Sequence, residues 1–333
     1  MHKRFFAVLL IIFYLLFSSC NCSKNEQEVF LSKIETDGLY VVYIDVGEGD
    51  ATFIRLPDGK SLLIDTGMND TDGKNLKKVQ DVLDVFSVKS LDYLVLTHTD
   101  SDHTGNAKEI IEKYSPKTAY VPYVKNKDKF EIFSESYTAL EEVKTDIKIS
   151  AMFEKIESEN YFTCFLSPKP YEMTDSEYDG INKAEPTDKE INNASAVIFL
   201  EYKNVRFIFL GDSEEETQET IIQNINAEYY TKFNDKIDLE NIDFFKVPHH
   251  GASDAVCKDF WKYLNTKNAI ISSGIDNLYG HPSDNALQTL QGINENYNLY
   301  RTDTDGSISV YVGEENYTVK TESGKEISAP IVA

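Results

Sequence analysis

The chain has 333 residues, of which 41% are hydrophobic, and this is enough to bury the core of one large domain or of two small ones; we favour one. Its 56 acidic and 33 basic residues give a formal net charge of −23 at pH 7. Because affinity for a nucleic-acid backbone comes mainly from clustered Lys and Arg, this charge disfavours a broad nucleic-acid-binding face.

The first 19 residues have the layout of a secretory signal. Lys3 and Arg4 precede an apolar run from Phe5 to Phe17, which is shorter than the roughly 20 residues that span a bilayer. The segment that follows, Phe17-Ser18-Ser19-Cys20, resembles the lipobox of bacterial lipoproteins, in which cleavage leaves a lipid-bearing N-terminal cysteine. These features predict a signal peptide over residues 1–19, a lipid anchor on Cys20 and export to the cell envelope. The alternative is an ordinary signal peptide that is cut nearby.

Residues 20–37 are largely polar and charged and show no hydrophobic period, so we predict a flexible tether there and a folded domain over residues 38–333. Four cysteines are too few for a disulfide scaffold, and two of them, Cys20 and Cys22, lie in the tether. The other two, Cys164 and Cys257, either form a single bridge in an oxidising compartment or remain buried free thiols.

The first half of the domain is predicted to open with hairpins. Its β-branched and aromatic runs, separated by Gly and Pro, predict strands over residues 38–46, 51–56, 61–64, 93–96 and 119–121. The spacing of Leu76, Val79, Leu83 and Phe86 predicts a helix. Two more helices are predicted over residues 107–114 and 130–143.

The second half alternates strands with helices after a polar segment without a period, residues 171–192, which we predict to be a long loop or insertion. Strands are predicted over residues 196–202, 205–210, 244–247, 269–272, 299–302 and 308–312, and helices from Ser213 and over residues 255–264 and 286–293. Because the opening hairpins need antiparallel pairing, the pattern favours two packed sheets flanked by helices over a singly wound parallel sheet.

Four of the six histidines directly follow predicted strands: His98, His103, His249 and His250. Between Thr97 and His103, four side chains that can bind metal fall within six residues: His98, Asp100, Asp102 and His103. A tight turn can spread such side chains around two neighbouring cations, because alternate residues face opposite ways. The segment therefore predicts a metal centre.

This pattern resembles the signature His-x-His-x-Asp-His of the metallo-β-lactamase superfamily, with Asp100 in place of the second histidine. Other landmarks of that superfamily match in order: residues 63–67 (Leu-Ile-Asp-Thr-Gly), residues 209–212 (Phe-Leu-Gly-Asp) and His281. The resemblance runs from about Tyr40 to Val312, and implies an α/β fold in which two mixed sheets flanked by helices form an αββα four-layer sandwich.

Four segments further resemble the C-terminal domain of ComEC-type DNA-uptake proteins, and secreted phosphorylcholine esterases of the same subgroup are similar. These segments are residues 45–51, 97–103, 247–251 and 280–282. Asp at the second position of the signature is a feature of that subgroup. No long run of transmembrane helices is present in the sequence, so the resemblance implies a catalytic module that stands alone.

The resemblance also implies a set of ligands for two divalent metal ions. His98 and Asp100 would bind one ion, Asp102, His103 and His281 would bind the other, and Asp212 would bridge the two. The third ligand of the first ion is a histidine in many members and has no match here; Asn193 or Ser195 stands near that place. Because Asp100 makes the ligand set rich in oxygen, Mn²⁺ competes with Zn²⁺ as the native metal.

Several further residues are predicted to support this centre. Asp102, His249 and His250 are the candidate catalytic residues. One histidine of the pair is a ligand or proton donor and the other a substrate contact, unless one merely bonds a backbone carbonyl. Asp65 is predicted to orient a ligating histidine, with Asn193 in a similar supporting place. Asp50 is predicted to make a structural turn contact, and Tyr279 is a candidate for the lining of the pocket.

Together these features predict an exported metal-dependent hydrolase that uses a metal-activated water on phosphodiester bonds, in nucleic acid or in an envelope polymer. The net charge argues against nucleic acid, although Lys125, Lys127 and Lys129 are candidates for a local basic strip or a solvated loop. The alternatives are hydrolysis of a carbon ester, lactone or lactam, and a noncatalytic metal-binding lipoprotein scaffold.

Overall fold

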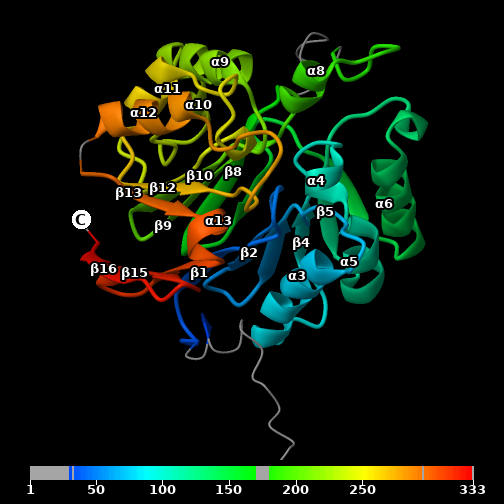
Figure 1. Ribbon diagram of the computed structural model, residues 1–333, viewed down its shortest axis with the longest axis horizontal. Coiled ribbons are helices and arrows are strands. Elements are labelled where there is room, and N and C mark those ends of the chain that lie inside the picture. Colours follow the sequence, from blue (N-terminus) through cyan, green and yellow to red (C-terminus); the bar gives the residue numbers. More distant parts are fainter. Residues whose placement is uncertain (1–29, 32–33, 170–179, 295, 332–333) are drawn as a thin grey trace, which may run out of the picture.

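The computed structural model describes residues 30–31, 34–169, 180–294 and 296–331 (Figure 1). The predicted signal peptide, the anchor Cys20 and most of the tether lie outside the described residues. Among the described residues, no helix is both long enough and apolar enough to cross a membrane. Cys164 and Cys257 are buried free thiols, so the bridge between them does not form.

The first sheet has nine strands in the order β16-β15-β14-β1-β2-β3-β4-β5-β6. They are β1 (Leu39–Tyr43), β2 (Thr52–Arg55), β3 (Ser61–Ile64), β4 (Tyr93–Val95), β5 (Thr118–Val121), β6 (Asp146–Ile149), β14 (Ile308–Val312), β15 (Asn316–Thr321) and β16 (Glu326–Pro330). Pairing is antiparallel from β16 to β3, as the opening hairpins predict, and parallel from β3 to β6.

The second sheet has seven strands in the order β13-β12-β11-β10-β9-β8-β7. They are β7 (Lys155–Glu157), β8 (Tyr161–Ser167), β9 (Val197–Tyr202), β10 (Val205–Phe209), β11 (Phe244–Lys246), β12 (Asn268–Ile271) and β13 (Asn298–Arg301). Strands β10 to β13 run parallel, whereas β7 to β10 pair antiparallel. Both sheets are therefore mixed, as predicted.

Alternating side chains on single strands divide the core into layers. On β1, Val41 and Tyr43 pack between the two sheets, whereas Tyr40 and Val42 face the helices on the other side. On β10, Phe207 packs between the sheets and its neighbour Ile208 faces the second group of helices. Because successive side chains of a strand point to opposite faces, each sheet is covered on both sides. The predicted αββα four-layer sandwich is confirmed.

Two groups of helices form the outer layers, and Figure 1 shows them on opposite sides of the pair of sheets. The first sheet is covered by α3 (Lys74–Val85), α5 (Ala107–Tyr114) and α6 (Glu131–Glu142). The second is covered by α9 (Glu215–Asn226), α10 (Tyr229–Phe233), α11 (Lys258–Leu264) and α12 (Asp284–Ile293). Shorter helical turns are α4 (Ser101–Thr104), η1 (Lys127–Lys129), α8 (Asp188–Asn192), η2 (His249–Gly251) and α13 (Thr302–Asp305).

Two predictions about irregular segments need correction. The end of the predicted loop over residues 171–192 is helix α8, which a capping box stabilises: the Thr187 hydroxyl accepts from the Glu190 N–H, and the Glu190 carboxylate accepts from the Thr187 N–H. In the segment predicted to be a tether, Leu31 is buried against the first helical layer and the Glu35 N–H donates to the Tyr40 hydroxyl. Ordered contacts therefore begin before residue 38.

Candidate metal centre

The candidate residues lie just after the ends of strands in both sheets. Strand β4 runs into α4, which carries Asp102 and His103, while β10 ends before Asp212 and β11 ends before η2, which carries His250. Carboxyl ends of parallel strands meet at one edge of a sheet, where α/β proteins place their ligand sites. Residues more than 100 positions apart therefore meet there.

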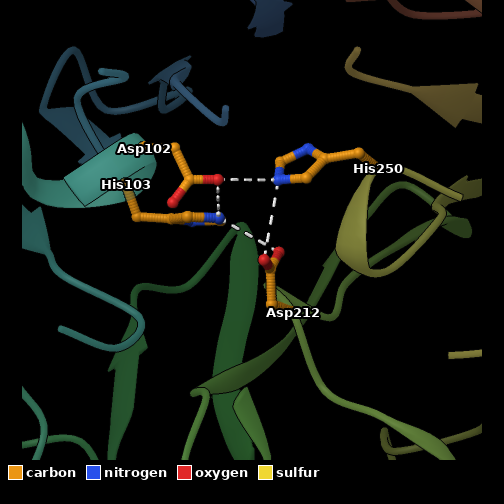
Figure 2. A group of neighbouring side chains, drawn as sticks. All are labelled: Asp102, His103, Asp212 and His250. Carbon is orange, nitrogen blue, oxygen red and sulfur yellow. Dashed lines mark hydrogen bonds and ion pairs between the residues drawn. The ribbon is translucent and has the colours of Figure 1, made fainter. Parts of the chain in front are cut away.

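Four of these side chains form a compact cluster, which Figure 2 shows: Asp102, His103, Asp212 and His250. Each offers one ligand atom, and these atoms all lie within 4.8 Å of one another. Nε2 of His250 lies 3.0 Å from Oδ2 of Asp102, and Nε2 of His103 lies 3.0 Å from Oδ1 of Asp212. Two imidazoles and two carboxylates around one point form a donor set typical of zinc or manganese sites.

Further possible ligand atoms lie near Oδ2 of Asp212. Nε2 of His98 is 3.8 Å from Oδ2 of Asp100 and 3.9 Å from Oδ2 of Asp212. Nε2 of His249 is also 3.9 Å from that Asp212 oxygen. Oδ2 of Asp212 is also 3.5 Å from Nε2 of His250, so this carboxylate adjoins both the cluster and the further ligand atoms, as a bridging carboxylate must.

Buried atoms without hydrogen-bond partners test whether these residues suit a cation. Among the described residues, Nε2 of His98 is buried and makes no hydrogen bond, and its nearest carboxylate oxygen is 3.8 Å away. Nε2 of His103 and Oδ1 of Asp212 are also buried, and they lie 3.0 Å from each other with no further partner in the part of the chain that the structure describes. Leaving a buried polar atom unsatisfied costs about 1–3 kcal/mol, and a divalent cation beside His98 and Asp212 would satisfy it. The donor set therefore fits the implied metals.

His281 lines the same cavity but lies outside the four-residue cluster, so its role as a ligand of the second ion stays a prediction. Its Nδ1 is 2.7 Å from Oε1 of Glu48, and its ring centroid is 6.0 Å from that of His250. His250 belongs to the cluster because Nδ1 of His250 donates to the Ser272 carbonyl over 3.0 Å, which turns Nε2 toward Asp102. His250 has a φ of 54°, a left-handed conformation that the sequence does not reveal.

The geometry also assigns different positions to the two neighbouring histidines, His249 and His250. His250 is buried within the cluster, whereas His249 is partly exposed at its rim, with Nδ1 3.2 Å from Oδ1 of Asp254. His249 belongs instead to a looser group with Glu214 and Asp254. His250 therefore has the position of a ligand, and His249 that of a residue that meets the substrate.

Asp65 occupies the supporting position predicted for it. Its Oδ2 lies 2.8 Å from Nδ1 of His103 and its Oδ1 accepts a hydrogen bond from the Thr97 N–H over 2.8 Å. We assign the proton of that imidazole to Nδ1, because Nδ1–H can donate to the carboxylate. When a cation takes the place of the proton on Nε2, the lone pair of that nitrogen is directed at the cluster.

Asn193 does not support the cluster. Its side-chain oxygen accepts from the N–H groups of Glu214 and Thr217, at 3.1 and 3.4 Å, so it caps the start of helix α9. Ser195, the other candidate, places its hydroxyl oxygen 3.2 Å from the N–H of Asp212, which donates to it. Neither residue supplies the missing third ligand.

The sequence analysis did not identify a buried lysine that lies beside the cluster. Nζ of Lys246 in β11 lies 2.7 Å from Oδ2 of Asp50, and both side chains are buried. Asp50 therefore forms an ion pair across the two sheets instead of the predicted turn contact, while its N–H donates to the carbonyl of Asp102 over 3.2 Å. A lysine inside the apolar run Phe244 to Val247 was the available signal.

The Gly-rich loop packs directly against the metal-binding turn. A Cβ atom on Gly49, which has a φ of +130°, would lie 2.3 Å from the carbonyl oxygen of Asp102. Only glycine tolerates both that conformation and that approach. The loop thereby brings Glu48 beside His281 and Asp50 beside Lys246.

Burial and neighbouring charge shift the pKa values on the His98 side. Burial lowers the pKa of His98 to about 4, and the adjacent His103 adds to this effect. Burial, together with the nearby carboxylates of Asp102 and Asp212, raises the pKa of Asp100 to about 7. Without a cation, both shifts favour the uncharged forms of the His98 imidazole and the Asp100 carboxyl group.

The four-residue cluster behaves in the opposite way. Burial alone would raise the pKa of Asp102 and of Asp212, but the adjacent His103 and His250 outweigh it and hold both values below the usual range. Burial alone would lower the pKa of His103 and of His250, but the neighbouring carboxylates raise both values well above normal. The carboxylates stay ionised, which is the form that binds cations.

Three cluster residues, Asp102, Asp212 and His250, line a cavity of about 1270 Å³ whose other lining residues are largely acidic. Its lining residues include Glu48, Asp188, Glu214, Glu215, Glu216, Glu219 and Asp254. Lys189 is the one lysine or arginine among the described lining residues. The predicted basic strip lies elsewhere, where Lys127 packs over the ring of Tyr137. Tyr279 lines the cavity as predicted.

Comparison with known proteins agrees with this geometry. Residues 44–274 match the metallo-β-lactamase superfamily, and the chain belongs to this superfamily, whose members are generally metal-dependent hydrolases. The chain is 27% identical over 286 residues to ComE operon protein 3 of Bacillus subtilis (strain 168). This match covers 80% of this chain and 32% of that protein. It is 22% identical over 249 residues to Recombination protein 2 of Haemophilus influenzae, covering 74% of this chain and 26% of that protein.

These findings confirm the predicted superfamily and the resemblance to ComEC-type proteins. The chain spans about a third or less of the length of the two relatives. Among solved structures, YhfI of Bacillus subtilis, a metallo-β-lactamase fold protein, is 12% identical with a TM-score of 0.47 and covers 88% of this chain and 100% of that chain.

Proposed function

We propose that the chain is a metal-dependent phosphodiesterase that holds two divalent cations on either side of Asp212. The observation that carries this proposal is the convergence of Asp102, His103, Asp212 and His250, with His98 and Asp100 beyond Asp212. When bound, such cations supply Lewis-acid activation of a water molecule and of the phosphoryl group. The oxygen-rich set that includes Asp100 favours Mn²⁺ as a competitor of Zn²⁺.

The side chains around the cluster have the task of holding and orienting the ligands. Asp65 fixes the ring of His103, the Ser272 carbonyl fixes that of His250, and the Asp50 N–H fixes the backbone of Asp102. His249, at the rim of the cluster, is placed to contact the substrate. Preorganised ligands lose little freedom on binding, which favours both metal affinity and catalysis.

The acidic lining of the cavity limits which phosphodiesters can serve as substrates. Polynucleotides carry a charge at every phosphate, and the rim carboxylates with the net charge of −23 would repel them. The likeness to ComE operon protein 3 covers a third of that protein and supports the same type of catalytic domain. We therefore favour a small phosphodiester or an envelope polymer over nucleic acid.

Hydrolysis of two chromogenic substrates tests this proposal. Purified protein loaded with Mn²⁺ or Zn²⁺ should release p-nitrophenol from bis-p-nitrophenyl phosphate, and EDTA should abolish the release until metal is restored. A chromogenic β-lactam should be turned over far more slowly. Preference for the lactam would support the carbon-ester and lactam alternative, and the absence of any metal-dependent turnover would support the scaffold alternative.

We also propose that the protein is exported and anchored through lipid on Cys20, on the strength of the leader described above. When the full chain is expressed in a bacterium, it should sediment with the membranes, and Cys20→Ala should release it or block its maturation. The matched control is Cys22→Ala, which should sediment like the wild type. Equal release of both variants, or sedimentation of Cys20→Ala as a processed chain, would contradict the anchor.

A further inference from the structure

The loop that carries His281 presents an unusual amount of apolar surface. Leu278, Ile275 and Tyr279 are 99%, 75% and 70% exposed, and they are the three most exposed large hydrophobic side chains of the described residues. All three lie within five positions, between strand β12 and helix α12. Isolated exposed hydrophobic residues are ordinary, but a group beside a ligand site marks a binding surface.

Hydrogen bonds hold this loop in a defined shape. The Asn277 side-chain oxygen accepts from the N–H groups of Tyr279 and His281, at 3.2 and 2.9 Å, and its amide donates to the carbonyls of Gly274 and His281. The N–H of Gly274 donates to Oε2 of Glu48 over 2.8 Å. The apolar side chains are thus displayed by an ordered loop, which reduces the entropic cost of binding.

One of these three apolar residues also lines the catalytic cavity. Tyr279 lines that cavity, and its ring stacks on the imidazole of His281 with centroids 5.6 Å apart and an interplanar angle of 17°. Leu278 and Ile275 do not line the cavity; they are exposed on the same loop, one and four positions before Tyr279. A group that leaves the metal centre past Tyr279 would therefore reach the loop that carries these two aliphatic side chains.

The rest of the rim shows which kind of group suits this surface. Carboxylates of α8, α9 and the segment after η2 line the cavity, which disfavours a second phosphate next to the first. A single planar ring would need only the face of Tyr279. Two exposed aliphatic side chains next to it fit a longer, uncharged aliphatic group instead.

We propose that the loop from Gly274 to Pro282 binds an aliphatic chain joined to the phosphodiester, so that the substrate class is lipid-like. This inference rests on the proposed function, since it names the substrate of that same site. Tyr279 receives the part of the chain next to the phosphate, and Leu278 and Ile275 cover the part that extends outward.

A series of soluble substrates tests this inference. p-Nitrophenyl phosphodiesters whose second alcohol is ethanol, hexanol or decanol are compared below their micelle concentrations with the metal-loaded protein. We expect kcat/KM to rise at least about tenfold from the ethyl to the decyl ester, since each fully buried CH₂ contributes up to roughly fourfold. The double variant Ile275→Ser/Leu278→Ser should lose most of this rise and keep the ethyl rate within about twofold.

The matched control is Ile132→Ser/Ile327→Ser, which removes two exposed isoleucines on α6 and β16 and should keep the wild-type dependence on chain length. A flat wild-type series, or an unchanged slope in the Ile275→Ser/Leu278→Ser protein, would overturn the inference. The p-nitrophenyl phosphodiester of thymidine is compared in the same assay. Preference for it over the decyl ester that is lost in Tyr279→Ala would also overturn the inference, because the occupant would then be a nucleobase.

A binding measurement separates this inference from the proposed function. Ethyl, hexyl and decyl phosphate are titrated calorimetrically into the metal-loaded wild type and the Ile275→Ser/Leu278→Ser variant, with no turnover required. Affinity that rises with chain length only in the wild type supports the subsite even if no diester is hydrolysed. Equal affinity for all three phosphates overturns the subsite even if bis-p-nitrophenyl phosphate is cleaved.

Discussion

Replacing Asp212 with asparagine is expected to lower phosphodiester hydrolysis at least about a thousandfold, equivalent to about 4 kcal/mol in the activation barrier. The change keeps the size of the side chain and removes the one carboxylate that lies between the two groups of ligands, 3.0 Å from His103 and 3.9 Å from His98. Metal content measured by mass spectrometry should fall together with kcat, because both candidate ions depend on this residue.

A second carboxylate of the same cavity supplies the control. Asp188 lines the cavity but belongs to no group of metal-competent residues among those described, so Asp188→Asn should keep both metal content and most of the activity. If Asp212→Asn kept its metal and its rate, the bridging role would be wrong. If both variants lost activity with metal intact, the charge of the cavity and not the ligand would be responsible.

Replacing Lys246 with methionine is expected to lower the free energy of unfolding by about 3–5 kcal/mol, as measured by urea denaturation. The lysine is 2% exposed and its Nζ lies 2.7 Å from the buried carboxylate of Asp50, which would remain as an uncompensated charge. Asp50 also hydrogen-bonds the backbone of Asp102, so metal affinity should fall as well. In Lys246→Met/Asp50→Asn, which removes both charges, much of the lost stability should return.

Lys77→Met is the matched control for this effect. Lys77 also pairs with a carboxylate at 2.7 Å, that of Asp81, but its side chain is 67% exposed on helix α3. Exposed pairs of this kind contribute at most about 1 kcal/mol, so the control should unfold nearly like the wild type. Equal destabilisation of both variants would show that burial of the Lys246–Asp50 pair is not the cause.

The fold was largely predictable because its buried strands carry strong local patterns. Strand β3 and helix α5 begin and end where the sequence predicts, since apolar runs or helical spacing meet clear turn residues there. Strands β6 and β16 were missed because they are largely exposed at sheet edges, so no apolar face marks them. Strand β8 was missed although it is fully buried; its run Tyr161–Ser167 offered a signal that was overlooked.

The site was predictable where one turn holds the ligands and less so where distant loops meet. His98, Asp100, Asp102 and His103 follow from a single segment and its resemblance. The place of His250 in the cluster depends on the left-handed backbone of η2 and on a hydrogen bond to the Ser272 carbonyl, which no local pattern encodes. Asn193 was misplaced for a similar reason, because its side chain is engaged by the start of α9.

The most direct test of the metal centre is anomalous scattering from crystals of the protein grown with Mn²⁺. We expect two peaks on either side of Asp212, each within about 2.0–2.3 Å of its ligands, with His250 bound to one ion and His281 still bonded to Glu48. A peak coordinated by His281 in place of His250, or no peak at Asp212, would contradict the arrangement on which the proposed hydrolysis depends.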